Sequence, residues 1–302
     1  MIPVVASLAL RSLLQGPRLP LTVVASFAHA AYLRVDTGVT AADPPMLVTL
    51  VTRDGVDHPN AVTLPVSAVE QPLSGLHRGS TGTIGAGWLL LADRSYRPVR
   101  WRCPVPVLPP VHAAVLTAAV GRARAHLAAR TTPLPGQLSS PLRTVAEALV
   151  GDDPQASRSG AGRLIGLGPG LTPAGDDLLA GLLAGLRVLA PAVSPTPVGV
   201  DDAAAALGRD IVRRALGRTT DVSVALLRHA ADGAVVTPAA RLLTALTRAD
   251  GPVDRRIAAA TDELLAVGST SGRDLATGLL TAGEVVGRVA RGTAGRAVAT
   301  AA

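Results

Sequence analysis

The sequence contains very little cysteine, no lysine and few aromatic residues. Cys103 is the only cysteine among 302 residues, which excludes a disulfide framework and a cysteine metal cluster. Because Cys103 lies between Arg102 and Pro104 in a proline-rich segment, we expect a buried structural thiol rather than a nucleophile. Aromatic residues make up 2% of the chain, so an aliphatic core of Leu, Val and Ala is expected.

Arginine alone carries the basic charge. The formal net charge is +7, and the 29 basic residues are all arginine. They are scattered rather than gathered in a block of the kind that marks a nucleic-acid-binding tail. Aromatic side chains are too few to form a stacking platform for single strands. We therefore expect no nucleic-acid partner.

Long uncharged apolar runs are also missing. Arg187 interrupts the most apolar segment before it reaches the length of roughly 18 residues that a membrane helix needs. Residues 1–10 are apolar but lack the basic segment of a signal peptide. We expect a cytoplasmic protein without membrane contact.

Two sequence patterns divide the chain. Short β-rich runs such as 46–52 and 88–92 alternate with Gly, Pro, Asn and Asp up to about residue 102. Beyond the proline-dense segment 104–110, apolar residues recur at helical spacing, as in 113–130 and 142–150. The sequence predicts an α+β fold with an antiparallel β-rich domain over 1–108, forming a small barrel or sheet. An all-helical domain is expected to follow over 109–302.

The stretch Gly-Leu-Gly-Pro-Gly-Leu-Thr-Pro-Ala-Gly-Asp-Asp at 166–177 is too rich in glycine and proline for regular structure. Leucines at helical spacing follow it, so we expect a tight loop leading into a helix capped by Thr172, with Pro173 in its first turn. The N–H groups and the positive dipole end of such a helix start favour an anion. We expect a phosphate or small carboxylate to bind Gly166, Gly168, Gly170, Thr172 and Gly175. The competing interpretation is a tight turn that allows close helix packing.

Two acidic residues, Asp176 and Asp177, occupy the first turn of this helix. They complement the helix dipole but would repel a bare phosphate. Mg²⁺ held by carboxylates and by substrate phosphate oxygens would allow the acidic residues and a bound phosphate to lie close together. We therefore expect Asp176 and Asp177 to act in catalysis or to bind Mg²⁺, and we expect no organic cofactor.

The motif has an internal echo. Gly-Asp-Asp-Leu-Leu-Ala-Gly-Leu-Leu at 175–183 recurs as Gly-Arg-Asp-Leu-Ala-Thr-Gly-Leu-Leu at 272–280. Small residues four apart let helix backbones approach closely, so we predict that the two helices pack through Gly181 and Gly278. Their N-termini would then converge on one pocket. The second copy would contribute Ser269, Thr270, Ser271, Gly272, Arg273 and Asp274. The alternative is a central helix pair whose Asp residues are only caps.

A third polar cluster lies in 217–223. Ser223 is expected to cap the helix that follows, and Thr219 and Thr220 flank it. Clustered hydroxyls at a helix start also bind oxyanions, so all three are further candidates for substrate binding.

These three segments resemble the DUF2877 family. Residues 166–177 look like its signature, 268–272 with Asp274 like a second block, and 219–223 like a third. The family includes a subunit of the bacterial oxamate carbamoyltransferase of allantoin (purine) degradation, which needs other subunits. The resemblance implies a carbamoyltransferase subunit that handles carbamoyl phosphate and oxamate, or a relative that acts on a different small anion.

In such a reaction the loop would bind phosphate and Arg273 would hold the acceptor carboxylate. Asp177 or Asp274 would bind Mg²⁺ or accept a proton. Two other functions would use the same residues. One is a Mg²⁺-dependent phosphoryl transfer or hydrolysis of a small anion, and the other is a non-catalytic scaffold or ligand-sensing subunit.

Overall fold

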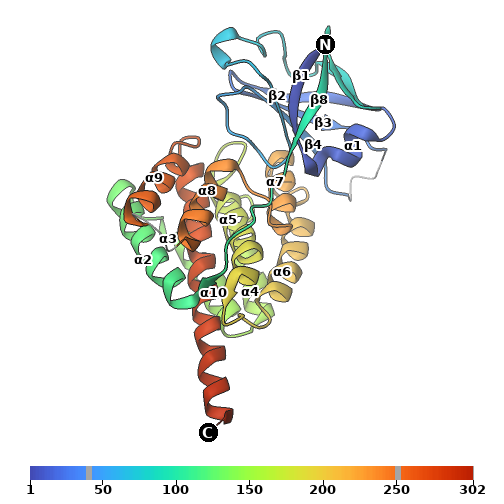
Figure 1. Ribbon diagram of the computed structural model, residues 1–302. Coiled ribbons are helices and arrows are strands. Elements are labelled where there is room, and N and C mark those ends of the chain that lie inside the picture. The colour runs from blue at the N-terminus through green and yellow to red at the C-terminus, as the bar shows by residue number, and fades with distance from the viewer. Residues whose placement is uncertain (39–42, 249–252, 302) are drawn as a thin grey trace. The chain divides into compact units, whose positions relative to one another are not determined.

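The computed structural model describes residues 1–38, 43–248 and 253–301. The chain divides into two compact units, Met1–Pro104 and Val105–Ala302. The first consists mainly of strands and the second mainly of helices (Figure 1), which confirms the predicted α+β class. Within the described ranges, no helix combines the length and the apolar character that crossing a membrane requires.

In the described part of the first unit, eight strands close into a barrel in the order β1–β5–β4–β3–β2–β6–β7–β8. The strands are β1 (Ile2–Ser7), β2 (Leu19–Ser26), β3 (Ala30–Val35), β4 (Met46–Val51), β5 (Ala61–Thr63), β6 (Thr81–Gly85), β7 (Trp88–Leu91) and β8 (Arg94–Arg102). A short helix, α1 (Arg11–Gln15), follows β1. The interior is aliphatic, as the composition predicts, with Tyr96 as a buried aromatic exception.

The barrel is not antiparallel throughout. Six of its strand pairs are antiparallel, as expected, whereas β1–β8 and β4–β5 are parallel. A period-two pattern identifies a strand but not the direction of its partner. The segment before β5 is held in place by Asn60, whose Nδ2 donates to the Leu47 carbonyl at 2.9 Å. The Thr49 hydroxyl donates to Asn60 Oδ1 at 3.2 Å.

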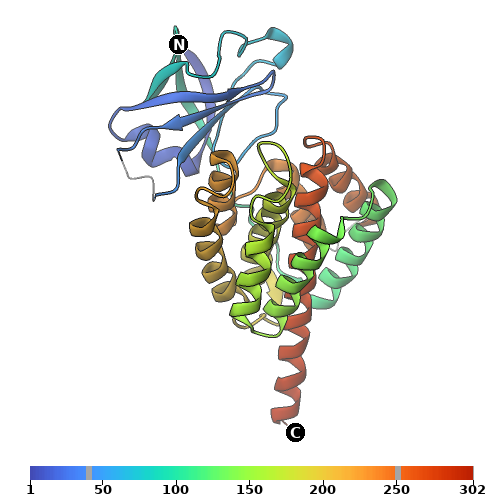
Figure 2. The same ribbon diagram turned by 180° about the vertical axis from the view of Figure 1, so that it is seen from behind.

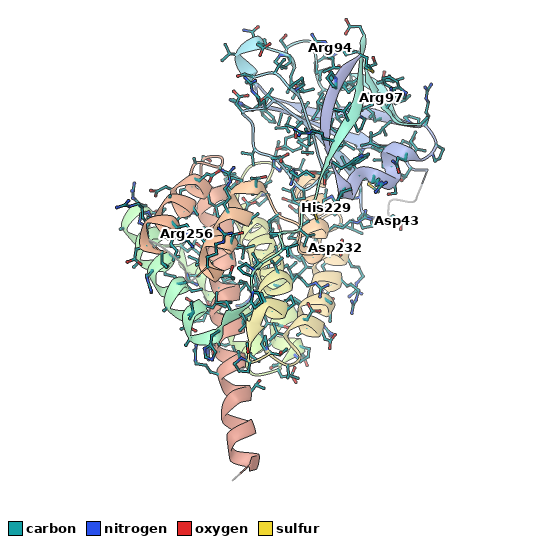
Figure 3. All side chains as sticks on the ribbon, viewed as in Figure 1. Asp43, Arg94, Arg97, His229, Asp232 and Arg256 are labelled. Atoms are coloured by element: carbon teal, nitrogen blue, oxygen red, sulfur yellow. The ribbon has the colours of Figure 1, made fainter. Side chains whose placement is uncertain are left out.

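The last strand, β8, carries Arg94 and Arg97 (Figure 3). The Arg97 guanidinium lies 5.5 Å from the centre of the Trp88 ring, a cation–π contact. Cys103 follows β8 directly and is exposed, so the expectation of a buried thiol is wrong. The chain leaves the sheet at this point, and the sheet therefore does not cover the side chain.

The second unit contains the helices α2 (Ala113–Arg130), α3 (Gly136–Val150), α4 (Pro154–Leu164), α5 (Ala174–Leu189), α6 (Val200–Ala215), α7 (Asp221–Ala231), α8 (Thr237–Thr247), α9 (Val253–Leu265) and α10 (Ser271–Ala301). It is not entirely helical, because β9 (Val111–His112) pairs in parallel with β10 (Val193–Ser194). The helix α5 is the core of the unit: Ala174 and Arg187 are its only residues that are not buried. The most extensive helix contact of the unit is between α5 and α10, which lie side by side in Figures 1 and 2.

Candidate functional site

The helices α5 and α10 pack backbone against backbone through their glycines. A β-carbon on Gly181 would lie 2.2 Å from the carbonyl oxygen of Leu275, and one on Gly185 would lie 2.6 Å from the Ala282 β-carbon. At the helix starts, the Thr172 and Ser271 hydroxyls share a hydrogen bond of 3.0 Å. The two helices therefore run in the same direction from N-termini that meet. The pairing and the convergence predicted from the internal echo are both confirmed.

The echo extends into the turns that lead into the two helices. In each turn, the N–H of one turn residue donates to a leucine carbonyl at the end of the preceding helix. The carbonyl of this turn residue, Leu167 or Val267, then accepts from the N–H of the first-turn glycine. The distances are 2.9 Å for Leu167 to Leu164, 3.0 Å for Val267 to Leu264, and 2.9 Å for both Gly175 to Leu167 and Gly272 to Val267. A β-carbon on Gly175 or on Gly272 would lie 2.0 Å from that leucine carbonyl oxygen. The same turn is thus built twice, and both first-turn positions require glycine.

The loop before α5 depends on left-handed backbone. Gly166, Gly168 and Gly170 have φ values of 73°, 125° and 95°, which other residues rarely adopt. The Gly166 N–H donates to Asp176 Oδ1 at 2.8 Å. Gly168 and Gly170 are exposed, and no acceptor in the described part of the chain meets their N–H groups. Two backbone donors therefore remain for a ligand.

Asp176 anchors this loop. It is 2% exposed, and its second oxygen accepts a hydrogen bond from the Thr219 hydroxyl. Because both oxygens of Asp176 already accept hydrogen bonds, this carboxylate positions the loop and the start of α7. The Thr219 hydroxyl is in turn occupied by its hydrogen bond to Asp176. The contacts of Asp176 give no support to the prediction that it binds a metal ion.

The other hydroxyls of the α7 start also hold the loop. Thr220, and not Ser223, is the N-cap of α7: its oxygen accepts from the Ser223 N–H at 3.1 Å. This corrects the expected cap, because the helix begins three residues earlier than the apolar pattern indicated. Thr220 and Ser223 both donate their hydroxyls to the Leu171 carbonyl, Ser223 at 3.3 Å.

The start of α5 also differs from the expectation. Pro173 occupies the N-cap position and makes no side-chain cap, whereas Thr172 was expected there. The Gly175 N–H is satisfied by the loop, and the Asp176 N–H bonds to the Pro173 carbonyl at 2.9 Å. The Thr172 hydroxyl is thereby left to face Ser271 in the second copy of the motif.

Asp177 is the most perturbed carboxyl group of the site. It is 8% exposed, and its Oδ2 atom is buried without a hydrogen-bond partner in the described residues. Burial raises the pKa of Asp177 from 3.8 to about 7; hydrogen bonds from Ser271 and Thr172 oppose the shift, and the charge of Asp274 adds to it. At neutral pH this side chain exists in both protonation states, as a proton-transferring group requires.

Asp274 is the counterpart of Asp177 on α10. It is fully buried, and its Oδ2 atom also has no partner in the part of the chain that the structure describes. Arg273 holds the other oxygen through Nε at 2.8 Å and Nη2 at 2.7 Å. Burial raises the pKa of Asp274, and the Arg273 hydrogen bond and charge oppose this shift. The convergence of the helix starts therefore brings together two carboxyl groups that each present an unpartnered oxygen.

The remaining residues of the second copy form the exposed edge of the site. Ser269 and Thr270 are exposed and Ser271 is half-buried. The Thr270 carbonyl accepts from the Asp274 N–H at 3.1 Å, which closes the first turn of α10.

The donor set bears on the expected Mg²⁺. Among the residues that the structure describes, no group of three or more His, Cys, Asp or Glu is placed to hold a metal ion. Asp177 and Asp274 offer two carboxylates, and Mg²⁺ commonly binds one or two carboxylates together with substrate phosphate oxygens. The residues that fit this role are thus Asp177 and Asp274, rather than Asp176 and Asp177.

A cavity beside the site did not emerge from the sequence. It opens between α2, α3 and α10, and Arg273 forms part of its lining. The signal that could have revealed it is the polar stripe Arg273, Thr277, Thr281, Glu284 and Arg288, at helical spacing.

Comparison with known families adds one finding. Residues 164–283 match the family model described as "Oxamate carbamoyltransferase subunit AllH". The matched segment contains the loop, the start of α7 and the start of α10, and it confirms the resemblance seen in these motifs. No solved structure matches the chain. The match supports the interpretation of this chain as a subunit of an oxamate carbamoyltransferase.

Proposed function

We propose that this chain is a carbamoyltransferase subunit that binds an anionic substrate where the N-termini of α5 and α10 converge. The proposed reaction is carbamoyl transfer from carbamoyl phosphate to the amide of oxamate, in allantoin and purine catabolism. One observation carries the proposal: Asp177 and Asp274 each present a buried, unpartnered carboxyl oxygen at the starts of two parallel helices. The Asp177 carboxyl group lies beside the hydroxyls of Thr172 and Ser271.

The phosphate group would bind the exposed part of the loop. Gly168 and Gly170 offer free N–H groups, and two helix N-termini add their partial positive charges. This electrostatic contribution is larger than that of one helix, because both dipoles point at the same place. The hydroxyls of Thr172 and Ser271 contact each other and Asp177, and they would bind phosphate oxygens by turning their hydrogens toward the ligand.

Asp177 would move the proton. In carbamoyl transfer, a bond forms between the acceptor nitrogen and the carbamoyl carbon, the bond from that carbon to the phosphate oxygen breaks, and the nitrogen loses a proton. A carboxylate with a pKa of about 7 can accept this proton at neutral pH and release it to solvent or phosphate afterwards. Burial keeps the pKa of Asp177 high, and the charge of Asp274 adds to this effect.

Arg273 has two roles in this proposal. It neutralises Asp274, and its side chain is 18% exposed. The guanidinium has five N–H donors, so those that do not contact Asp274 can bind an acceptor carboxylate. Where Mg²⁺ takes part, Asp177 and Asp274 would hold it against the substrate phosphate, and the ion would neutralise developing negative charge.

Asp177→Asn tests the proposal, with Asp202→Asn as the control. Asp202 is also in the first turn of a helix, α6, but is exposed. The measurement is carbamoyl-phosphate-dependent turnover with candidate partner subunits, with and without Mg²⁺, alongside phosphate binding by calorimetry. We expect Asp177→Asn to lower turnover by roughly 100-fold or more while the protein stays folded, and Asp202→Asn to retain it.

Three outcomes would contradict the proposal or one of its parts. Wild-type turnover by Asp177→Asn would return this residue to a purely structural role. Phosphate release without any carbamoylated acceptor would instead favour the hydrolytic alternative. Loss of phosphate binding on chelation would assign the ion, rather than the loop, as the main anion ligand.

A further inference from the structure

We propose that the cavity between α2, α3 and α10 is a second binding site, for a small organic anion with an apolar or planar body. We call it the arginine cavity, because Arg124, Arg143, Arg273, Arg288 and Arg291 line it. Its volume is about 750 Å³, within the range of roughly 300–1,000 Å³ typical of small-molecule sites. This inference does not depend on the carbamoyl-transfer proposal.

The floor of the arginine cavity is apolar. Val120, Leu127, Leu142 and Val285 line it and are themselves buried in the helical unit. Such a surface favours a hydrocarbon or aromatic body, because water leaves both surfaces on binding. The volume exceeds what carbamoyl phosphate or oxamate fills, and neither has an apolar body, so these floor residues fit a different ligand.

The upper lining carries excess positive charge. Five arginines line the cavity against two glutamates, Glu147 and Glu284, and Arg273 is paired with Asp274, which leaves two positive charges uncompensated. Arg124 donates to Glu284 Oε2 at 2.9 Å and to the Thr281 hydroxyl at 2.8 Å. Arg288 forms two bonds with Glu147, at 2.7 and 2.9 Å. The first pair joins α2 to α10 and the second joins α10 to α3, and each neutralises its glutamate.

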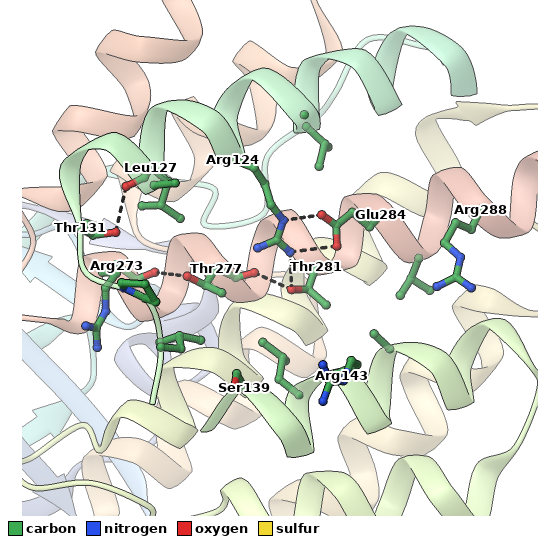
Figure 4. A pocket seen from close by; sticks show the side chains of 18 of the residues that line it. Arg124, Leu127, Thr131, Ser139, Arg143, Arg273, Thr277, Thr281, Glu284 and Arg288 are labelled. Atoms are coloured by element: carbon green, nitrogen blue, oxygen red, sulfur yellow. Dashed lines mark hydrogen bonds and ion pairs between the residues drawn. The ribbon is translucent and has the colours of Figure 1, made fainter. Parts of the chain in front are cut away.

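Arg143 is the residue left to hold a ligand. Its exposed guanidinium has no hydrogen-bond acceptor among the described residues and acts on Glu147, one turn later in α3, through its charge alone, whereas Arg291 donates to the Thr117 hydroxyl and Arg273 to Asp274. Figure 4 shows Arg143 on α3 across the hollow from α10, with Arg273 and Arg288 along the facing helix. An anionic group placed between them would meet a free guanidinium above an apolar floor. Carboxylate, phosphate and sulfonate groups all satisfy this geometry.

Arg273 connects the arginine cavity with the carboxylate pair. The same guanidinium that lines the cavity holds Asp274, so an anion in the cavity competes with Asp274 for it. A ligand there would therefore change the charge balance at the starts of α5 and α10 without occupying them. Coupling of this kind is reciprocal, so a ligand at the loop would alter affinity in the cavity by the same factor.

The test uses two fluorescent probes that differ in one group. The dye 8-anilinonaphthalene-1-sulfonate combines an aromatic body with an anion, and N-phenyl-1-naphthylamine has the same body without the sulfonate. We expect one sulfonate-dye site per folded chain, and about a 10-fold loss of affinity in Arg143→Glu. The uncharged dye should bind Arg143→Glu as it binds the wild type.

Two further variants complete the design. Arg163→Glu makes the same charge reversal on α4, at an exposed residue outside the cavity, and should keep the wild-type affinity for the sulfonate dye within twofold. Ala146→Trp places a large side chain in the cavity and should abolish binding of both dyes. Melting curves must match the wild type, since these dyes also bind partly unfolded chains. Equal loss of sulfonate-dye affinity in Arg143→Glu and Arg163→Glu, or no loss in Arg143→Glu, would overturn the proposal even if Ala146→Trp does not fold.

Discussion

Gly181 and Gly278 face each other in the contact between the parallel helices α5 and α10. A β-carbon added to either glycine would clash with the backbone of the other helix. The β-carbon on Gly278 would lie 2.2 Å from the Leu178 carbonyl oxygen, and the one on Gly181 would lie 2.2 Å from the Leu275 carbonyl oxygen. Contacts below 3.0 Å are essentially never made by real β-carbons. The same close approach brings Asp177 and Asp274 together one helical turn earlier, so the packing and the chemistry of the site have one cause.

Gly278→Ala should therefore destabilise the helical unit. One methyl group forces α5 and α10 apart, and overpacking of this kind costs about 1–3 kcal/mol and occasionally more. Gly121→Ala is the matched control: Gly121 lies within α2, and a β-carbon there meets nothing within 4 Å. Because alanine is the better helix former, the control should be stabilised by up to about 1 kcal/mol. Urea unfolding measures both, and equal effects in the two variants would show that the helices do not depend on this contact.

The sequence predicted the helix pair well because the echo is a local pattern with one structural meaning. Small residues four apart, Gly181 and Gly185 in one copy and Gly278 and Ala282 in the other, specify the face that packs, and the first-turn Asp of each copy marks the end that converges. The helix α2 was likewise predicted within its observed bounds, since apolar spacing is clear there. By contrast, α4 was missed: its sequence Pro-Gln-Ala-Ser-Arg-Ser-Gly-Ala-Gly-Arg-Leu has little apolar character, and tertiary contacts decide its conformation. The start of α3 was placed too late because Pro141 lies inside that helix.

The candidate site was predicted as a set of residues but not as a division of roles. The sequence grouped Asp176 with Asp177 because they are neighbours. Successive residues on a helix point in different directions, so Asp176 faces Gly166 and Thr219 while Asp177 faces α10. Which carboxylate is satisfied depends on partners many positions away in sequence. The arginine cavity was not predicted for the same reason, since residues from three separate helices line it.

The elevated pKa of Asp177 makes the stability of the protein depend on pH. In the unfolded chain this carboxyl titrates near 3.8, and in the folded protein near 7. The folded state therefore binds the proton more tightly, and its contribution to stability is complete below pH 3.8 and is lost as pH rises to about 7. The shift corresponds to at most about 4 kcal/mol.

Asp177→Asn should remove this dependence, because an amide does not titrate. We expect the free energy of unfolding of the variant, relative to the wild type, to increase between pH 4 and pH 7 and to stay constant above that. Asp202→Asn supplies the comparison: it loses a first-turn carboxylate at an exposed position and should change stability by up to about 1 kcal/mol. A difference between Asp177→Asn and wild type that is flat across this range would show that Asp177 titrates normally.

Arg273 and Asp274 form a buried ion pair, and removing the cation should be costly in a pH-dependent way. Asp274 is fully buried, so Arg273→Met leaves a carboxylate without its partner, which costs about 3–5 kcal/mol at neutral pH. The pKa of Asp274, already raised by burial, should rise further, so the deficit shrinks as the pH falls and the carboxyl takes up a proton. The double variant with Asp274→Asn should regain most of the lost stability, because no charge remains buried.

Arg288→Met is the control on the same helix: both Arg288 and Glu147 are exposed, and such pairs contribute about 0–1 kcal/mol. Chemical unfolding of the wild type and the three variants at pH 4.5 and pH 7.5 measures these differences in the free energy of unfolding. If Arg273→Met costs no more than Arg288→Met at pH 7.5, Asp274 must already be protonated in the wild type. Asp274 would then hold a proton rather than a charge before any substrate binds.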